Sequence, residues 1–139
     1  MKKPSFRARV NHVAVQTACF ENAFKFYTEL LGLQILKDPF LFSGKRTLAW
    51  LDAGAVAIEL YSVKNGEEPL PYSKRSVGPD HISFEVEDLD ALINYLRDQN
   101  VTILKPPFLP ATGDINQPRV AFIEGPDGEE IEFREVSRD

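Results

Sequence analysis

The sequence lacks most of the features that mark a secreted, membrane or nucleic-acid-binding protein. Among 139 residues there is one cysteine, Cys19, which excludes an internal disulfide and is typical of a reducing compartment. No apolar run approaches the roughly 20 residues of a membrane-spanning helix, and none follows the basic start as in a signal peptide. The 16 basic residues are scattered among 21 acidic ones, without the concentrated positive charge that nucleic acid requires. We therefore expect a cytoplasmic protein with a small-molecule substrate and no nucleic-acid or membrane partner.

Common catalytic motifs are also missing. There is no glycine-rich phosphate loop, and no Gly-x-Ser-x-Gly or Ser-x-x-Lys motif indicates a nucleophile. Cys19 has no basic neighbour in the sequence that would activate its thiol. Histidine is scarce, since only His12 and His81 occur. Any chemistry that needs an imidazole therefore depends on these two residues.

One unusual phrase occurs twice in the chain. Ile35–Leu41 is ILKDPFL, and 68 residues later Ile103–Leu109 is ILKPPFL. Further stretches match in the same order at similar offsets: Asn11–Val15 with Asp80–Phe84, Leu48–Asp52 with Val120–Glu124, and Ile58–Leu60 with Ile131–Phe133. This order is not expected by chance and indicates one structural unit built twice.

Each half predicts the element order β-α-β-β-β. Apolar residues recur at helical spacing from Phe20 to Leu31, with Gly32 as the stop, and Asp88 is the N-cap of a second helix over 89–96. In the first half, strands are expected at Val10–Gln16, Leu33–Leu36, Thr47–Asp52 and Val56–Tyr61, and in the second half at His81–Val86, Val101–Leu104, Arg119–Glu124 and Glu129–Val136. Loops are expected at Asp38–Arg46 and Pro106–Pro118, and a hairpin turn at Pro126–Gly128. The predicted fold class is α+β.

The sequence predicts two modules, over residues 8–61 and 80–137, which are joined by a linker over residues 62–79. The linker is rich in proline, glycine and charge. Because neither half alone has enough residues for a stable core, we expect a single domain over 1–139 in which the modules pack together, or pairing with another chain.

Strand alternation places a histidine and a glutamate of each half on the face opposite the helix. In the first half these are His12 and Glu59, and in the second half His81 and Glu132. Two neutral imidazoles and two carboxylates suit a divalent first-row metal such as Zn²⁺, Ni²⁺, Co²⁺, Mn²⁺ or Fe²⁺. The alternative is that both glutamates are solvated strand residues. The repeat equivalents Trp50 and Phe122 are expected in the core, with a pocket wall as the alternative.

These residues resemble the vicinal oxygen chelate proteins, the glyoxalase/bleomycin resistance/dioxygenase superfamily. The stretches on which the resemblance rests are Asn11–Val15, Phe26-Tyr27 with Leu31–Leu33, Ile58–Leu60, Asp80–Ile82, and Pro126–Gly128 with Ile131–Phe133. The resemblance covers Val10 to Val136 and implies a cupped mixed sheet of two βαβββ modules with helices on its outer face, around one metal ion. It also implies a homodimer, with the cup formed within one chain or between two.

Glyoxalase I, a lactoylglutathione lyase, looks most similar within this superfamily. The resemblance implies His12, Glu59, His81 and Glu132 as ligands of one divalent metal, with Zn or Ni favoured. It implies an enediolate stabilised by the metal, with Glu132 or Glu59 as the catalytic base. Strand neighbours on the same face are expected to line a substrate pocket: Gln16, Tyr61, Ser83 and Arg134.

Three positions depart from the glyoxalase I pattern. Gln16 replaces an arginine and Val63 an asparagine that contact glutathione, and Gly125 replaces the aspartate before Pro-Asp-Gly. The resemblance therefore supports the metal site and not glutathione as a partner. Glu59 argues against an epimerase, which has glutamine there, and against a ring-cleaving dioxygenase, which uses three ligands. These enzymes and a non-catalytic drug- or metabolite-binding protein remain the alternatives.

Overall fold

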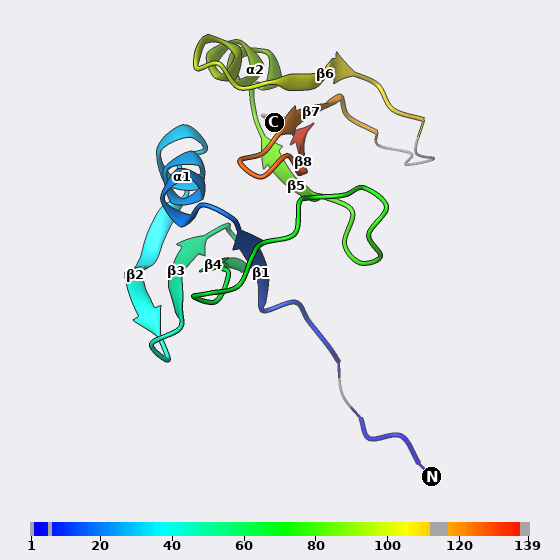
Figure 1. Cartoon of the computed structure of the whole chain (residues 1–139). Helices are drawn as coiled ribbons and strands as arrows, with labels where there is room; N and C mark the ends of the chain where they lie inside the picture. Colours follow the sequence, from blue (N-terminus) through cyan, green and yellow to red (C-terminus); the bar gives the residue numbers. More distant parts are fainter. Residues whose placement is uncertain (1, 6, 112–116, 137–139) are drawn as a thin grey trace. The chain divides into compact units, whose positions relative to one another are not determined.

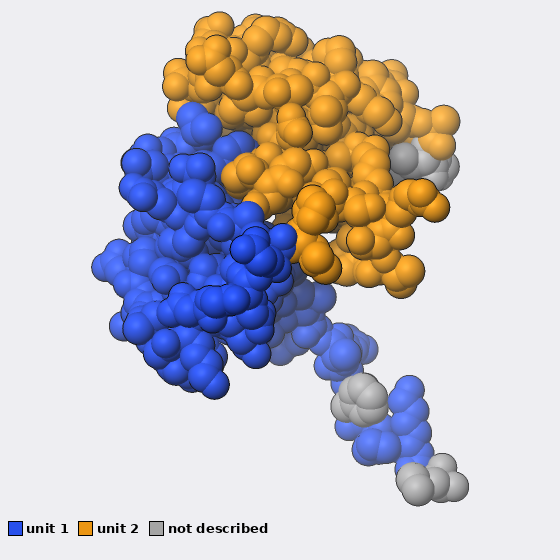
Figure 2. All heavy atoms as spheres, in the orientation of Figure 1, with its two compact units in different colours: residues 1–69 blue, residues 70–139 orange. Residues whose placement is uncertain are grey.

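The computed structural model describes residues 2–5, 7–111 and 117–136. It divides the chain into two compact units, residues 1–69 and 70–139, which Figure 2 shows in different colours. Each unit has the order β-α-β-β-β and contains one four-stranded mixed sheet. The predicted α+β class and the tandem of βαβββ modules are thereby confirmed, while the single domain over 1–139 stays a prediction.

The first unit runs from β1 to β4. Its elements are β1 (His12–Thr17), α1 (Phe20–Lys25), a π-helical continuation η1 (Phe26–Leu30), β2 (Gln34–Phe42), β3 (Arg46–Asp52) and β4 (Ala57–Ser62). The strand order is β1-β4-β3-β2, with β1 parallel to β4 and the other pairs antiparallel (Figure 1). Gly32 has a φ of 75° and follows the helix as the predicted stop.

The second unit repeats this arrangement. Its elements are β5 (Ile82–Val86), α2 (Leu89–Asp98), β6 (Ile103–Phe108), β7 (Val120–Glu124) and β8 (Glu130–Glu135). The order β5-β8-β7-β6 has the same parallel and antiparallel pairs as the first sheet. The Asp88 side chain accepts a hydrogen bond from the Ala91 N–H at 3.1 Å, which confirms the predicted N-cap. Cys19, in the equivalent place before α1, makes no such bond.

The repeated phrase lies in the edge strand of each sheet. The sequence predicted that these strands end at Leu36 and Leu104 before a proline-containing loop, and this prediction is wrong. Strands β2 and β6 continue to Phe42 and Phe108, with register shifts around Lys37 and Lys105 in equivalent places. Proline cannot donate to the sheet, but an edge strand with bulges tolerates it because one side of the strand has no partner.

One helix covers one face of each sheet and forms a separate core with it. In β4, Ile58 and Leu60 are buried while Glu59 and Tyr61 are half-buried. The buried apolar side chains on the helix side and in the helices are Ala23, Phe26, Tyr27, Ala49, Leu51, Ile58 and Leu60 in the first unit, and Leu89, Ile93, Leu96, Ala121, Ile123, Ile131 and Phe133 in the second. Leu48 and Val120 are also buried, on the opposite face of their sheets. Burial of each large side chain stabilises the fold by about 1.5–3 kcal/mol, so the helix side of each sheet is fixed.

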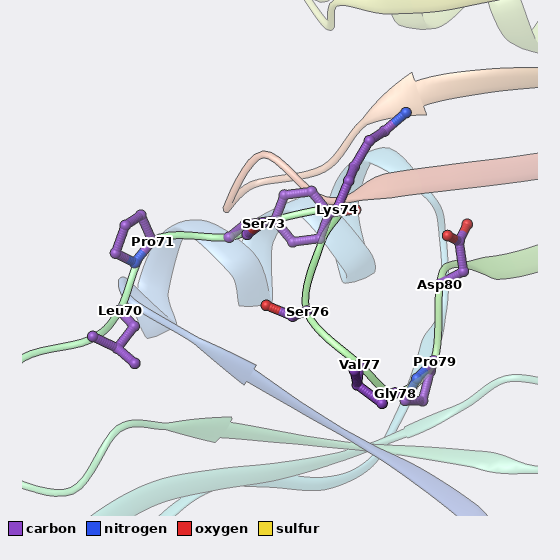
Figure 3. A pocket seen from close by; sticks show the side chains of 10 residues that line it. Leu70, Pro71, Ser73, Lys74, Ser76, Val77, Gly78, Pro79 and Asp80 are labelled. Carbon is purple, nitrogen blue, oxygen red and sulfur yellow. The ribbon is translucent and has the colours of Figure 1, made fainter.

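The connection between β4 and β5 contains no helix or strand. Residues 70–74 and 76–80 of this connection line a pocket of about 340 Å³ (Figure 3). Lys74 forms an ion pair with Glu130 at the start of β8, which fastens the connection to the second unit. No helix in the described part of the chain is long and apolar enough to cross a membrane.

The turn between β7 and β8 shows how the chain accommodates Gly125. A side chain at this position would overlap the carboxylate of Glu129. Glu129 Oε1 accepts the backbone N–H of Asp127 at 3.3 Å. An aspartate at position 125 would accept the N–H two residues later in an Asx turn, so Glu129 supplies the equivalent carboxylate from the far side of the hairpin. Burial, together with the charges of Asp127 and Glu124, raises the pKa of Glu129 to about 7.

We expect Glu129→Gln to stabilise the protein at pH 8 and to change little at pH 4. The raised pKa favours the protonated carboxyl in the folded state, so its contribution is complete below about pH 4.5 and is lost as pH rises through 7. Because the side chain is partly exposed, the expected gain in free energy of unfolding is about 1–2 kcal/mol. Thermal unfolding at the two pH values measures it, with Glu67→Gln in the exposed connection as the control. An equal effect of Glu129→Gln at both pH values contradicts the prediction.

Candidate metal centre

The candidate residues of the first unit lie on the sheet face opposite α1. His12, Ala14 and Gln16 of β1 are exposed and alternate with the more buried Val13 and Val15. We call this side of each sheet its open face. Glu59 lies in β4 between Ala14 of β1 and Trp50 of β3, which are its register partners. The predicted alternation therefore holds, and His12 and Glu59 share one face of one sheet.

The ring of His12 is held on two sides. Its Nδ1 lies 2.7 Å from Oδ1 of Asn11. Because an amide oxygen only accepts, Nδ1 donates in this bond, so Nε2 is the ring nitrogen that a neutral imidazole offers to a ligand. The ring also packs edge-on against Trp50, with centroids 5.0 Å apart. His12 thus presents the nitrogen that a metal needs, in a fixed orientation.

His81 of the second unit has the same surroundings. Its Nδ1 lies 2.7 Å from Oδ1 of Asp80, and this bond holds the pKa of Asp80 below its ordinary value. Its ring packs edge-on against Phe122 at 5.4 Å between centroids. Glu132 is adjacent, with 3.8 Å between its Oε2 and Nε2 of His81. The second unit therefore repeats the orientation of the histidine and adds a measured contact to its glutamate.

Sequence reasoning gave no role to Asn11 and Asp80, and it gave a pocket wall only as the alternative position of Trp50 and Phe122. Asn11 and Asp80, which orient the histidines, precede them at equivalent places in the repeat, and that equivalence was the available signal. Trp50 and Phe122 were expected in the core, but both are half-buried and pack against the histidines. Edge-on ring contacts of this kind limit the rotation of the imidazole.

The donor set of each unit suits a metal ion, although neither unit holds a complete set. A nitrogen and an oxygen that each bind one ion at about 2.1 Å lie no more than about 4.2 Å apart. The 3.8 Å between His81 and Glu132 is within this limit. Among the residues that the structure describes, no group of three or more histidine, cysteine or acidic side chains is positioned to hold a metal. The set of His12, Glu59, His81 and Glu132 spans the two units and stays a prediction.

Gln16 and Tyr61 belong to a polar network on the open face of the first unit. The Tyr61 hydroxyl donates a hydrogen bond to Glu59. Burial and, to a smaller extent, this hydrogen bond raise the pKa of Tyr61. Arg46 Nη2 donates to Gln16 Oε1 at 2.7 Å, and its guanidinium lies 4.0 Å from the centroid of the Tyr61 ring. The sequence placed Arg46 at the end of a loop, and the structure places it at the start of β3.

Ser83 and Arg134 lie on the open face of the second unit. Ser83 of β5 is the register partner of Glu132, and Arg134 of β8 is the partner of Glu85. The pocket of the connecting segment contains none of the predicted site residues, and its lining side chains are exposed. One of its lining residues, Asp80, directly precedes His81 in the sequence. The residues that line the pocket do not form a second candidate site.

Comparisons with known proteins identify relatives over most of the chain. An uncharacterised protein of Bacillus subtilis, YqjC, is 29% identical over 117 residues, covering 83% of this chain and 81% of the relative. A probable lactoylglutathione lyase of Synechocystis is 25% identical over 135 residues, covering 91% and 94%. A metallothiol transferase, FosB of Staphylococcus haemolyticus, is 25% identical over 126 residues, covering 89% and 81%. Relatives with different activities thus match at similar levels.

A solved structure and a family model agree with these relatives. The trypanothione-dependent glyoxalase I of Leishmania major aligns with a TM-score of 0.70 at 27% identity, over 93% of this chain and 87% of that one. Residues 9–133 match the model of the Glyoxalase/Bleomycin resistance protein/Dioxygenase superfamily. Two βαβββ units with a histidine and a glutamate on each open face are what the sequence resemblance implied. The chain belongs to the glyoxalase/bleomycin resistance protein/dioxygenase superfamily.

Proposed function

We propose that the protein is a divalent-metal-dependent lyase or isomerase of the glyoxalase I type, acting on a small substrate with adjacent oxygen atoms. The main support is that each unit carries an oriented histidine on the same open face as a glutamate. His12 and His81 both have Nδ1 bonded to the preceding side chain, which leaves Nε2 for a ligand. Relatives with lyase and metallothiol transferase activities add support at the level of the superfamily.

A complete site in this proposal contains His12, Glu59, His81 and Glu132. Two neutral imidazoles and two carboxylates suit Zn²⁺ or Ni²⁺, with Co²⁺, Mn²⁺ and Fe²⁺ as alternatives. The metal, when bound, supplies stabilisation for negative charge on adjacent substrate oxygens. Each unit contributes one histidine and one glutamate, so the site needs one unit of each kind, from the same chain or from two copies in a homodimer.

The surroundings of the two glutamates favour Glu132 as the catalytic base. Glu59 accepts a hydrogen bond from the Tyr61 hydroxyl, which restricts its movement. Glu132 lies 3.8 Å from His81 Nε2, a separation too long for a hydrogen bond. We infer that Glu132 removes a proton from one substrate carbon and returns it to the next, while Glu59 remains in place.

Glutathione is not the expected thiol of the substrate. Gln16 carries no charge, and its amide oxygen already accepts a hydrogen bond from Arg46. Val63, at the other position that contacts glutathione in glyoxalase I, has no polar side chain. The proposed chemistry therefore concerns the adjacent oxygens of a small substrate, with no assignment of a peptide thiol.

We expect the Zn²⁺- or Ni²⁺-loaded protein to isomerise a hemithioacetal of methylglyoxal. Metal analysis of the purified protein and an absorbance assay with several thiols measure binding and turnover separately. Glu132→Gln removes the base and a ligand, so kcat is expected to fall at least about 100-fold. Glu67→Gln, a substitution of the same kind in the exposed connection, leaves kcat unchanged. A protein that stays metal-free and inert after loading contradicts the proposal.

We expect Asn11→Ala and Asp80→Ala to weaken metal binding about 10- to 100-fold, because each side chain fixes the proton on Nδ1 of the following histidine. Titration calorimetry with Zn²⁺ measures this effect without reference to activity. Asn22→Ala and Asp98→Ala, at exposed positions of the helices, serve as matched controls. Unchanged affinity in both test variants shows that the histidines do not bind the metal through Nε2.

Mixing of two inactive variants distinguishes a site within one chain from a site between two. His12→Ala damages the first unit and His81→Ala the second. If sites form between copies, a refolded equimolar mixture recovers about a quarter of the wild-type sites, because half of the dimers are mixed and each has one intact site. If sites form within one chain, the mixture stays inactive.

A further inference from the structure

Arg46 is a cation held in a fixed position on the open face of the first unit. Its Nε donates to the carbonyl oxygen of Ser62 at 3.0 Å, and its Nη2 donates to Gln16 Oε1 at 2.7 Å. Its guanidinium carbon lies 4.0 Å from the centroid of the Tyr61 ring. Contacts with two neighbouring strands and with the ring below it restrict this side chain.

The charge of Arg46 is not neutralised by these contacts. Both of its acceptors are neutral oxygens, and in the described part of the chain it forms no ion pair with a carboxylate. A guanidinium has five N–H groups, and two are used here, so three remain available for a ligand. The half-buried position lowers the screening of this charge by water.

Arg119 at the start of the corresponding strand in the second unit shows the contrasting case. Its guanidinium pairs with Asp90 at 2.9 Å and with Glu135 at 3.1 Å. These carboxylates raise the pKa of Arg119 and satisfy its charge. Arg119 therefore has a structural role, whereas Arg46 forms no ion pair among the described residues.

Arg46 lies on the same face as the candidate ligands. In the pairing of β3 with β4, Trp50 lies opposite Glu59 and Leu48 lies opposite Tyr61. Arg46, Leu48 and Trp50 are two residues apart along β3 and therefore share one face. The guanidinium lies over Tyr61, which is two residues from Glu59, or roughly 7 Å along a strand. A small molecule that reaches Glu59 can therefore also reach the three available N–H groups.

We propose that Arg46 binds an oxyanion of the substrate, a carboxylate or phosphoryl group on the same molecule as the oxygens that the metal site holds. A planar guanidinium with several free N–H groups forms paired hydrogen bonds to such groups. Gln16 and Tyr61 position the guanidinium, and Arg46 selects for anionic substrates. This proposal rests on the proposed metal-dependent function, and it narrows the substrate class.

Three hydroxamates test the proposal on the Zn²⁺-loaded full chain, because a hydroxamate supplies two adjacent oxygens to a metal. Acetohydroxamate carries no anion, succinomonohydroxamate carries a carboxylate, and phosphonoacetohydroxamate carries a phosphonate. We expect the protein to bind at least one anionic probe about tenfold more tightly than acetohydroxamate, as one charge-assisted hydrogen bond provides. Calorimetry, or the fluorescence of the single tryptophan, Trp50, measures each Kd. The preferred anionic probe identifies the group.

Arg46→Gln is expected to abolish this preference and to leave the Kd of acetohydroxamate within about twofold. Arg46→Lys is expected to retain part of the preference, because lysine keeps the charge without the planar donors. This variant also serves as a control for misfolding caused by substitution at position 46. Lys45→Gln removes the same charge from the adjacent exposed residue and should keep the full preference. Equal preference in wild type and Arg46→Gln, or none in wild type, overturns the assignment of Arg46. Failure of all three probes to bind overturns the proposed metal function as well.

Discussion

Burial of one face of each sheet against a single helix is the constraint on which the candidate site depends. Ile58 and Leu60 in the first unit, and Ile131 and Phe133 in the second, must face the helix to leave water. Because successive strand residues point to opposite faces, Glu59 and Glu132 must then lie on the open faces. A shift of one residue in the register would bury both carboxylates and expose the core. The hydrophobic effect thus places the charged groups without any contact of their own.

Within that frame, the repeat preserves the metal-binding features and varies the surrounding charges. Each histidine is bonded through Nδ1 to the preceding side chain and packed against an aromatic ring from the third strand of its unit. The arginines near the start of that strand are not repeat equivalents, because Arg119 corresponds to Thr47 and Arg46 to Pro118. Arg119 stabilises the helix side of its unit through two carboxylates, whereas the hydrogen-bond acceptors of Arg46 in the described part of the chain are neutral oxygens on the open face.

The hairpin of the second unit illustrates a substitution compensated from elsewhere in the chain. Gly125 lacks the carboxylate that the family pattern has before Pro-Asp-Gly, and Glu129 fills the space and bonds to the Asp127 N–H. Sequence comparison at position 125 alone indicates a loss of the turn interaction. In the structure the Glu129 carboxylate accepts the Asp127 N–H instead, and burial of this carboxyl raises its pKa.

The sequence by itself determined the repeat, the order of elements, the helix-facing residues and the face that carries His12, Glu59, His81 and Glu132. These follow from local periodicity, which depends only on the order of apolar and polar residues. It did not determine the extent of the edge strands at Pro39 and Pro107, the contacts of Asn11 and Asp80 with the histidines, or the approach of Arg46 to Gln16. Only the tertiary structure decided these. The edge strands and the Arg46 contact depend on how strands that are distant in sequence pair, and the Asn11 and Asp80 contacts depend on the side-chain conformations of adjacent residues.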